Sequence, residues 1–218
     1  MRKFLHAGII VVSSVIVALP MAAADAATGH VLTIRSTGGA TVRPGAVLKA
    51  GLVKGSTAVF SLGSERLTCK SARFRTKVTS NPARPGRARE VLTAQSISKC
   101  TVNVQHVVVK SVRVTNLPFH VTVSDAKGHP VKVTGHSAAK PLMTTVTVSL
   151  GTLQVTCSYR AASITGHASN LHSTISFTKQ RFVKAGGSSL CAPAALFTGK
   201  FGPVRDSSVK GSPRVFVN

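Results

Sequence analysis

The chain has 218 residues, of which 28 are Lys or Arg and only 5 are Asp or Glu, so its formal net charge is +23. Its hydrophobic fraction of 43% is too high for a disordered basic tail and is sufficient for a packed core. So few carboxylates exclude most sites built on acidic clusters, such as calcium loops and two-metal nuclease centres. The composition therefore predicts a folded and strongly cationic protein.

The first 26 residues have the pattern of a secretory signal peptide. A short basic start precedes an apolar stretch, 7–19, and small residues follow it. Two A-x-A sites predict a mature chain that begins at Asp25 or Ala27. A retained membrane anchor is the alternative, but an apolar core of about 13 residues is short of the roughly 20 that span a bilayer. We therefore expect a secreted protein with no transmembrane segment after the signal peptide is removed.

The mature part reads as strands throughout. A first strand is expected at 31–34. Residues 119–124 and 131–134 alternate apolar and polar side chains around a turn-like sequence, which predicts a hairpin. The apolar residues 215–217 predict a docked final strand. Because no stretch has the 3.6-residue period of a helix, the expected fold class is all-β, an antiparallel β-sandwich.

Four cysteines, Cys69, Cys100, Cys157 and Cys191, lie in the mature part. An even number of cysteines in an exported chain predicts two disulfides, with three possible pairings. A zinc site is the alternative, but the sequence contains no C-x-x-C pair.

An internal repeat selects one of these pairings. Residues 57–69, TAVFSLGSERLTC, align without gaps with 145–157, TVTVSLGTLQVTC, and six positions are identical. The tripeptide TSN at 79–81 similarly matches ASN at 168–170, and a cysteine follows in each copy. A bridge formed within each copy predicts the disulfides Cys69–Cys100 and Cys157–Cys191.

The repeat also defines the expected organisation of the chain. It comprises a signal peptide (1–26) and a secreted β domain (27–218) with a strand region (27–55), repeat unit one (56–135), a linker (136–143) and repeat unit two (144–218). Side-chain alternation reverses at Gly63 and at Gly151, which predicts a bulge or tight turn in each copy. Whether the copies form one shared sandwich or two small ones stays open, and we favour one pseudo-symmetric unit.

Several of these motifs are similar to those of a known family. The segments L-T-C, T-S-N-P, N-L-P-F-x-V-T-V at 116–123 and the closing G-S-P-R-V-F-V-N resemble a family of actinobacterial secreted proteins with no assigned activity. The resemblance covers the chain from about residue 56 to its end. It implies secretion, β structure and paired cysteines, but no site residue. We expect more Ser, Thr and Asn in the family where this chain has Lys and Arg.

Few residues suit catalysis or metal binding. The spacing of Glu65 and Glu90 does not bring them together as a glycosidase pair, and Asp125 and Asp206 occupy matching turn positions where aspartate caps its own backbone. The histidines form no H-x-x-x-H or H-E-x-x-H motif, and G-x-S-x-G and phosphate-loop patterns are absent from the sequence. We therefore expect no enzyme activity, metal or cofactor. A hydrolase or metal site assembled only in three dimensions is the alternative.

The one sequence feature that suggests a binding site is a basic run between Glu65 and Glu90. Arg73, Arg75 and Lys77 alternate with uncharged residues, so on a strand they form a stripe on one face. The candidate anion-binding residues are Arg73, Arg75, Lys77, Arg84, Arg87 and Arg89. The matching stretch of the second copy, about 154–174, holds only Arg160, so these charges are not needed to build the unit. A solvated face in an already cationic protein is the alternative reading.

The sequence therefore predicts a secreted or cell-surface protein, not an enzyme, that binds an anionic polymer through guanidinium pairing and counterion release. Cell-wall polymer, acidic polysaccharide, extracellular DNA and lipid headgroups are the candidate ligands. Sequence-specific nucleic-acid binding is not expected, because no helix is available for a groove and few aromatic residues are available for base stacking. A structural or matrix protein without a specific ligand is the alternative.

Overall fold

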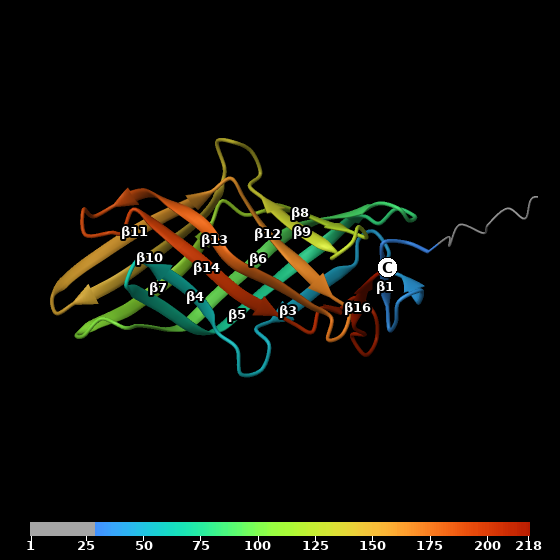
Figure 1. Ribbon diagram of the computed structural model, residues 1–218, viewed down its shortest axis with the longest axis horizontal. Coiled ribbons are helices and arrows are strands. Elements are labelled where there is room, and N and C mark those ends of the chain that lie inside the picture. The colour runs from blue at the N-terminus through green and yellow to red at the C-terminus, as the bar shows by residue number, and fades with distance from the viewer. Residues whose placement is uncertain (1–28) are drawn as a thin grey trace, which may run out of the picture.

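The computed structural model describes residues 29–218, and its regular elements are all strands (Figure 1). The strands, in chain order, are β1 (Leu32–Ile34), β2 (Ala40–Thr41), β3 (Val47–Gly51), β4 (Ala58–Leu62), β5 (Glu65–Ser80), β6 (Arg87–Val102), β7 (Val107–Thr115), β8 (Phe119–Ser124), β9 (Pro130–Thr134), β10 (Leu142–Leu150), β11 (Leu153–Ala161), β12 (Ser163–Ser169), β13 (Thr174–Gly187), β14 (Ala194–Phe201), β15 (Arg205–Asp206) and β16 (Val215–Val217). The predicted all-β class, the hairpin at β8–β9 and the final strand are confirmed. The predicted signal peptide, 1–26, lies outside the described residues.

The strand pairing corrects the predicted sandwich. Thirteen strands form one antiparallel sheet that closes on itself, and β16, β1 and β2 form a small second sheet. One ring of the closed sheet runs β4-β5-β6-β7-β10-β11-β13-β14 and back to β4. A second ring of paired strands shares β6 and β13 with the first. It connects these two strands through β8, β9 and β12 instead of through β7, β10 and β11. The closed barrel forms because β5, β6 and β13 are long enough to pair with several neighbours, which leaves few free edges.

Two tight turns occur where side-chain alternation reverses, as predicted. Leu62 pairs with Glu65, and Leu150 pairs with Leu153, so each hairpin has a two-residue loop. The first loop residue, Gly63 or Gly151, has a positive φ, which glycine adopts at no steric cost. The duplication of the whole unit stays a prediction.

The two predicted disulfides are confirmed. Cys69 and Cys100 lie opposite each other on β5 and β6, whereas Cys157 on β11 is bonded to Cys191 in the loop before β14. Disulfides of this kind indicate an oxidising compartment.

No helix in the described part of the chain is long and apolar enough to cross a bilayer.

The small sheet covers one end of the barrel, which we call the capped end and which lies at the right of Figure 1. Two asparagines hold this sheet in place. The Asn81 side chain accepts a hydrogen bond from Leu32 N (2.9 Å) and donates to the carbonyls of Leu32 (2.9 Å) and Val42 (2.8 Å). Asn170 similarly accepts from Val217 N (2.9 Å) and donates to Val217 O (2.6 Å). Leu32 and Val217 are partners in the sheet, so the two side chains hold one cross-strand pair from both sides.

The opposite end of the barrel has no such cover among the described residues, and we call it the open end. It is formed by four loops, at 63–64, 103–106, 151–152 and 188–193. Several aliphatic side chains on or beside these loops are exposed, including Val104, Leu153 (50%) and Leu190 (70%). The two ends of the barrel therefore differ in what protects their apolar residues.

Candidate functional site

The basic stripe lies on the outer surface of the barrel. Along β5, Arg73, Arg75 and Lys77 are exposed, while the residues between them, Phe74 and Thr76, face inward. Their charges therefore recur at intervals of about 7 Å along the strand.

Neighbouring strands extend this positive surface sideways. Lys49 on β3 lies opposite Arg75, and Arg205 on β15 lies opposite Lys49. Because adjacent strands are about 4.8 Å apart, three basic side chains cross the sheet within about 10 Å. Sequence analysis missed Lys49 and Arg205, because they come from segments far from the basic run and neither has a distinctive local motif.

These residues line a wide surface hollow of about 850 Å³, which we call the basic groove. Its charged lining residues are Lys49, Lys70, Arg73, Arg75 and Arg205. Polar groups of Gln95, Ser96, Ser207 and Ser212 complete it, and no carboxylate is among its described lining residues. Arg205 is held in position by a hydrogen bond from Nη1 to the Ser212 carbonyl (2.8 Å).

The other four candidate residues lie outside the lining of this groove, and Lys77 is the nearest of them along β5. Arg87 and Arg89 are exposed on β6, opposite residues of β8. Arg84 lies in the preceding loop with Nε 3.8 Å from Asp125 Oδ2, so its charge is partly neutralised. The six candidate residues therefore do not form one cluster.

Asp125 also differs from its predicted role. Its Oδ2 accepts a hydrogen bond from Gly86 N (2.9 Å), 39 residues away, so it does not cap its own turn. Asp206 behaves as expected, because its Oδ1 accepts a hydrogen bond from Ser208 N (2.9 Å). Asp125 bonds to Gly86 because β6 and β8 pair, which places the loop after β8 next to the loop before β6.

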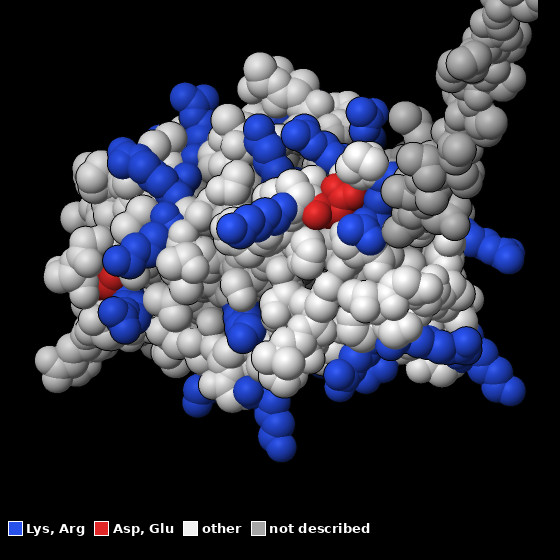
Figure 2. Space-filling view, turned by 45° about the vertical axis from the view of Figure 1, so that its right-hand side comes forward, with Lys and Arg blue, Asp and Glu red and all other residues white. Residues whose placement is uncertain are grey.

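The carboxylates do not neutralise the basic groove. Glu90 and Asp206 are buried, and Glu65 lies at the open end. Figure 2 shows that Lys and Arg side chains are numerous on one face of the molecule, whereas acidic side chains cover little of it. The lining of the groove therefore carries a net positive charge.

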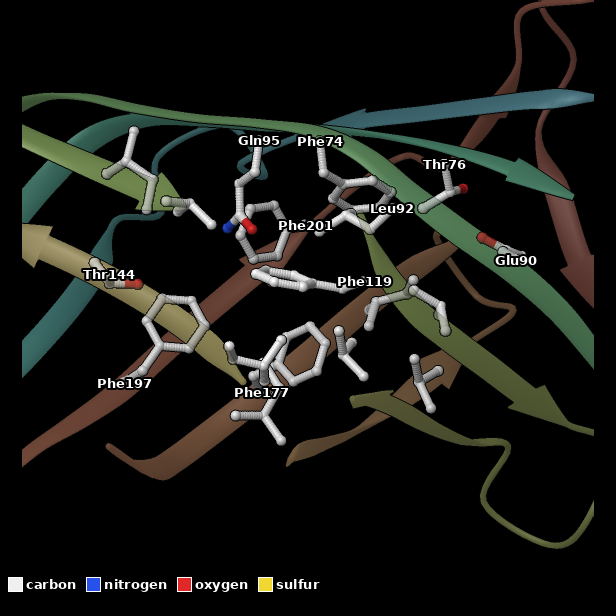
Figure 3. A pocket seen from close by; sticks show the side chains of 18 of the residues that line it. Phe74, Thr76, Glu90, Leu92, Gln95, Phe119, Thr144, Phe177, Phe197 and Phe201 are labelled. Carbon is white, nitrogen blue, oxygen red and sulfur yellow. The ribbon is translucent and has the colours of Figure 1, made fainter. Parts of the chain in front are cut away.

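A second candidate site lies inside the barrel. A cavity of about 80 Å³, which we call the central cavity, is lined mainly by aliphatic side chains and by Phe60, Phe74, Phe119, Phe177, Phe182, Phe197 and Phe201 (Figure 3). Glu90 on β6 faces this cavity although it is only 6% exposed. Burial raises the pKa of its carboxyl from 4.5 to about 7. Thr76 lies near enough to oppose this shift slightly, but its hydroxyl makes no normal hydrogen bond with any described residue.

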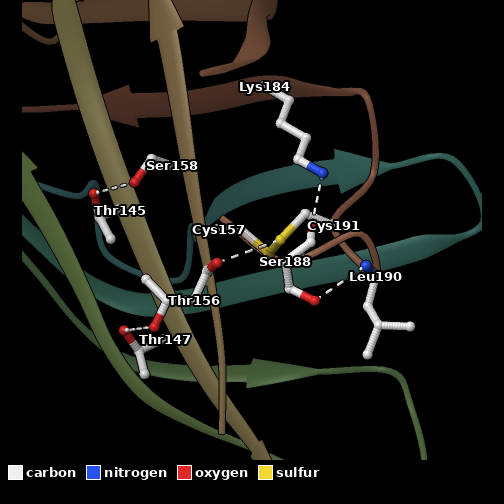
Figure 4. Close-up of a disulfide and its surroundings, with 9 residues drawn as sticks. All are labelled: Thr145, Thr147, Thr156, Cys157, Ser158, Lys184, Ser188, Leu190 and Cys191. Atoms are coloured by element: carbon white, nitrogen blue, oxygen red, sulfur yellow. Dashed lines mark hydrogen bonds between the residues drawn. A yellow bond between two sulfur atoms is a disulfide. The ribbon is translucent and has the colours of Figure 1, made fainter. Parts of the chain in front are cut away.

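A wider apolar hollow of about 320 Å³ adjoins the open end, and we call it the outer chamber. It is lined by Leu62, Leu67, Val102, Val148, Val155, Tyr159 and Ala195, among others, and by the Cys157–Cys191 disulfide. Figure 4 shows the loop that this disulfide holds, in which Lys184 Nζ donates to the Ser188 carbonyl (2.6 Å) and Ser188 Oγ accepts from Leu190 N (3.2 Å). Burial raises the pKa of the Tyr159 hydroxyl above its usual value. The loop thus forms an anchored wall of the chamber.

The arrangement offers little for acid–base chemistry. Glu65 and Glu90 lie near opposite ends of the β5–β6 pair, about 40 Å apart along the strands. The rings of His120 and His136 stack with centroids 5.4 Å apart, without a carboxylate partner among the described residues. Between residues 29 and 218, no three metal-ligating side chains gather in one place.

Two sites therefore stand out by their geometry, the basic groove outside the barrel and the apolar interior with its single carboxyl. Neither could be assigned by likeness to a known protein, because no family model, curated protein or solved structure matches the chain.

Proposed function

We propose that this protein is a secreted, non-catalytic binder of anionic polymers and that the basic groove is its binding surface. The observation that carries the proposal is the register of β5, β3 and β15, which lines up Arg75, Lys49 and Arg205 across the sheet. An ordinary solvated face has charges of both signs, whereas the groove has a single sign and a concave shape. The proposed contacts are Lys49, Lys70, Arg73, Arg75 and Arg205, with Lys77, Arg87 and Arg89 as outlying charges.

The lining of the groove favours recognition of the charged backbone of a polymer. Guanidinium groups pair well with phosphate and carboxylate oxygens, and serine hydroxyls can add hydrogen bonds. The aromatic lining residue, Phe74, is half-buried and also lines the central cavity, so it offers little surface on which a base could stack. A phosphate-rich cell-wall polymer, acidic polysaccharide or DNA would therefore be held by charge, without sequence preference.

Secretion is part of this proposal and is supported by the two disulfides and by the N-terminal sequence pattern. An extracellular location gives access to wall polymers and to DNA released from cells. The resemblance to actinobacterial secreted proteins is consistent with the same location.

The test is binding of the mature protein to teichoic acid and to duplex DNA over a range of salt concentrations. Replacing Lys49, Arg73 and Arg75 by Ser should reduce the slope of log K against log salt by about 2 to 3, because each neutralised phosphate contributes about 0.7 to 0.9. Circular dichroism and the unfolding midpoint should not change, since all three side chains are exposed.

A matched control separates the groove from diffuse charge. Replacing the exposed residues Lys110, Arg113 and Lys179 by Ser removes the same charge from other surfaces of the barrel. This variant should keep most of the salt dependence. Equal losses in the two triple variants would show that any three positive charges suffice, and the groove would not be a site.

A further inference from the structure

The barrel interior contains a polar group without a partner. Glu90 is buried without an ion pair to any described residue, and Thr76 Oγ1 beside it is buried without a hydrogen bond of normal geometry. Glu90 lies between the central cavity and a smaller hollow at the capped end, and no other titratable residue of the described chain lines either space. Leaving such groups buried and unsatisfied costs about 1–3 kcal/mol each. A ligand that donates a hydrogen bond to them would remove that cost.

The apolar space at the open end adjoins the cavity that Glu90 faces. Phe60 and Thr144 line both the outer chamber and the central cavity, so the two spaces are neighbours at these residues. From there the central cavity extends past Gln95 to Glu90, which lies five residues further along β6, a distance of about 16 Å. In Figure 3, Gln95 and Thr144 lie toward one side of the cavity, Glu90 and Thr76 toward the other, and phenylalanine rings lie between them.

The dimensions restrict the shape of a ligand. The central cavity, at about 80 Å³, has room for only about six water-sized spheres, so it favours a slender group over a bulky one. The outer chamber, at about 320 Å³, is within the usual range of small-molecule sites and is lined mainly by apolar groups, with Glu65 and Thr144 among the exceptions. The interior is therefore shaped for a chain that carries a single polar group at its inner end.

We propose that the barrel interior binds an unbranched aliphatic molecule with a hydrogen-bond-donating head, an alcohol or an amine, whose head lies at Glu90 and whose tail lies in the outer chamber. A carboxylic acid of the same length is disfavoured, because its ionised head would face the Glu90 carboxyl without a cation. This site lies inside the barrel, on the inner side of Phe74 and Gln95, which also line the basic groove, and it does not depend on the function proposed for that groove.

The test compares 1-octanol, octylamine and octanoate by isothermal titration calorimetry. Tyr159 is the only tyrosine in a chain without tryptophan and lines the outer chamber, so its fluorescence reports whether the ligand occupies that space. Octanol should bind at both pH 6 and pH 8 and change the Tyr159 emission, and octanoate should bind at least tenfold more weakly at pH 8. Each added methylene should strengthen binding about fourfold until the chain reaches the rim.

The pH dependence distinguishes the two head groups. The carboxyl of Glu90, with a pKa of about 7, is about one-tenth ionised at pH 6 and about nine-tenths at pH 8. Octylamine, which remains charged at both pH values, should therefore bind about tenfold more tightly at pH 8. Octanol should change much less, because it can hydrogen-bond with either form of the carboxyl.

Two variants place the head group. E90L should abolish the preference for octanol over octane, whereas D125N, which removes a carboxylate that lines neither the central cavity nor the outer chamber, should preserve it. A preference that survives in E90L, or octanoate binding as tightly as octanol at pH 8, would overturn the proposal. So would the absence of binding by all the ligands.

Occupancy of the outer chamber is tested separately by A192W, which places a large side chain in its lining. Octanol affinity should fall at least tenfold in this variant. Unchanged affinity together with an unchanged Tyr159 emission would refute occupancy of the chamber.

Discussion

The two ends of the barrel protect their apolar residues in different ways. At the capped end, Leu32 and Val217 of the three-stranded sheet are buried, and asparagine side chains bond to their backbone groups. At the open end, Leu153 and Leu190 are exposed on turns, and the chamber below them is hollow. Packing and hydrogen bonding are therefore concentrated at one end and access to the interior at the other.

Closure of the sheet does not by itself determine whether the interior is packed or accessible from outside. Closure pairs the strand edges, but the ends of the barrel must be finished by additional chain. Here residues from both sides of the barrel sequence, β1 and β16, finish one end only. Apart from the open-end disulfide, we expect substitutions at the capped end to change stability, and those at the open end to change binding.

The largest expected effect concerns the disulfide at the open end. Replacing Cys157 and Cys191 by Ala should lower the free energy of unfolding by about 4 kcal/mol, because the bridge closes a loop of 34 residues in the unfolded chain. Urea denaturation under oxidising conditions measures this. A loss below about 1 kcal/mol would mean that the unfolded chain is already compact in this region.

The next effect is a pH dependence that originates at Glu90. Its pKa is raised in the folded state, so the stability it contributes is fully present below about pH 4.5 and is lost as the pH rises to about 7. The loss should amount to about 3 kcal/mol, at 1.36 kcal/mol for each unit of pKa shift. Urea denaturation at several pH values should show this fall in the native protein and not in E90Q. A similar fall in both would assign it to other groups, such as the histidines.

The asparagines test the capped end directly. Asn81→Ala removes three buried hydrogen bonds and should cost about 3 kcal/mol, whereas Asn170→Ala removes two and should cost about 2 kcal/mol. Hydrogen exchange should show faster opening of β1 and β16 in both variants. Exchange that is accelerated instead at β10 and β11 would contradict the assignment of these residues to the cap.

The smallest effect is expected for the exposed leucines. L153S and L190S should change the free energy of unfolding by less than about 0.5 kcal/mol, since neither side chain is packed in the core. The matched change at the capped end, Leu32→Ala, removes a side chain that is 2% exposed and should cost about 2–5 kcal/mol. Comparable costs at the two ends, in urea denaturation, would mean that the open end is covered in solution.

Local sequence signals predicted much of the fold. Strand alternation located β8 and β9, the glycines at 63 and 151 located two turns, and the repeated segments gave the correct disulfide pairing. Closure of the barrel could not be predicted in the same way. It depends on pairings such as β14 with β4 and β11 with β13. These strands have the same alternation of apolar and polar residues as the others, so the pattern does not indicate which strand pairs with which.

The candidate sites were predictable only in part. The alternation of Arg73, Arg75 and Lys77 was sufficient to place them on one face, but no local signal connected them with Lys49 or Arg205. Glu90 is the clearest omission, because in the sequence it resembles the end of a charged run, while on β6 it alternates with Arg89 and faces inward. Only their places on β6 show that Arg89 faces solvent and Glu90 faces the interior.

The cap has a consequence for the kinetics of folding. The Asn218 side chain donates a hydrogen bond to Thr33 Oγ1, 185 residues earlier, and β1 cannot pair with β16 until both segments have been synthesised. Contacts with such large sequence separation form late and make folding slow. A chain that emerges gradually, from a ribosome or through an export channel, therefore stays uncapped until residues 215–217 are free. The order of synthesis itself delays completion of the fold.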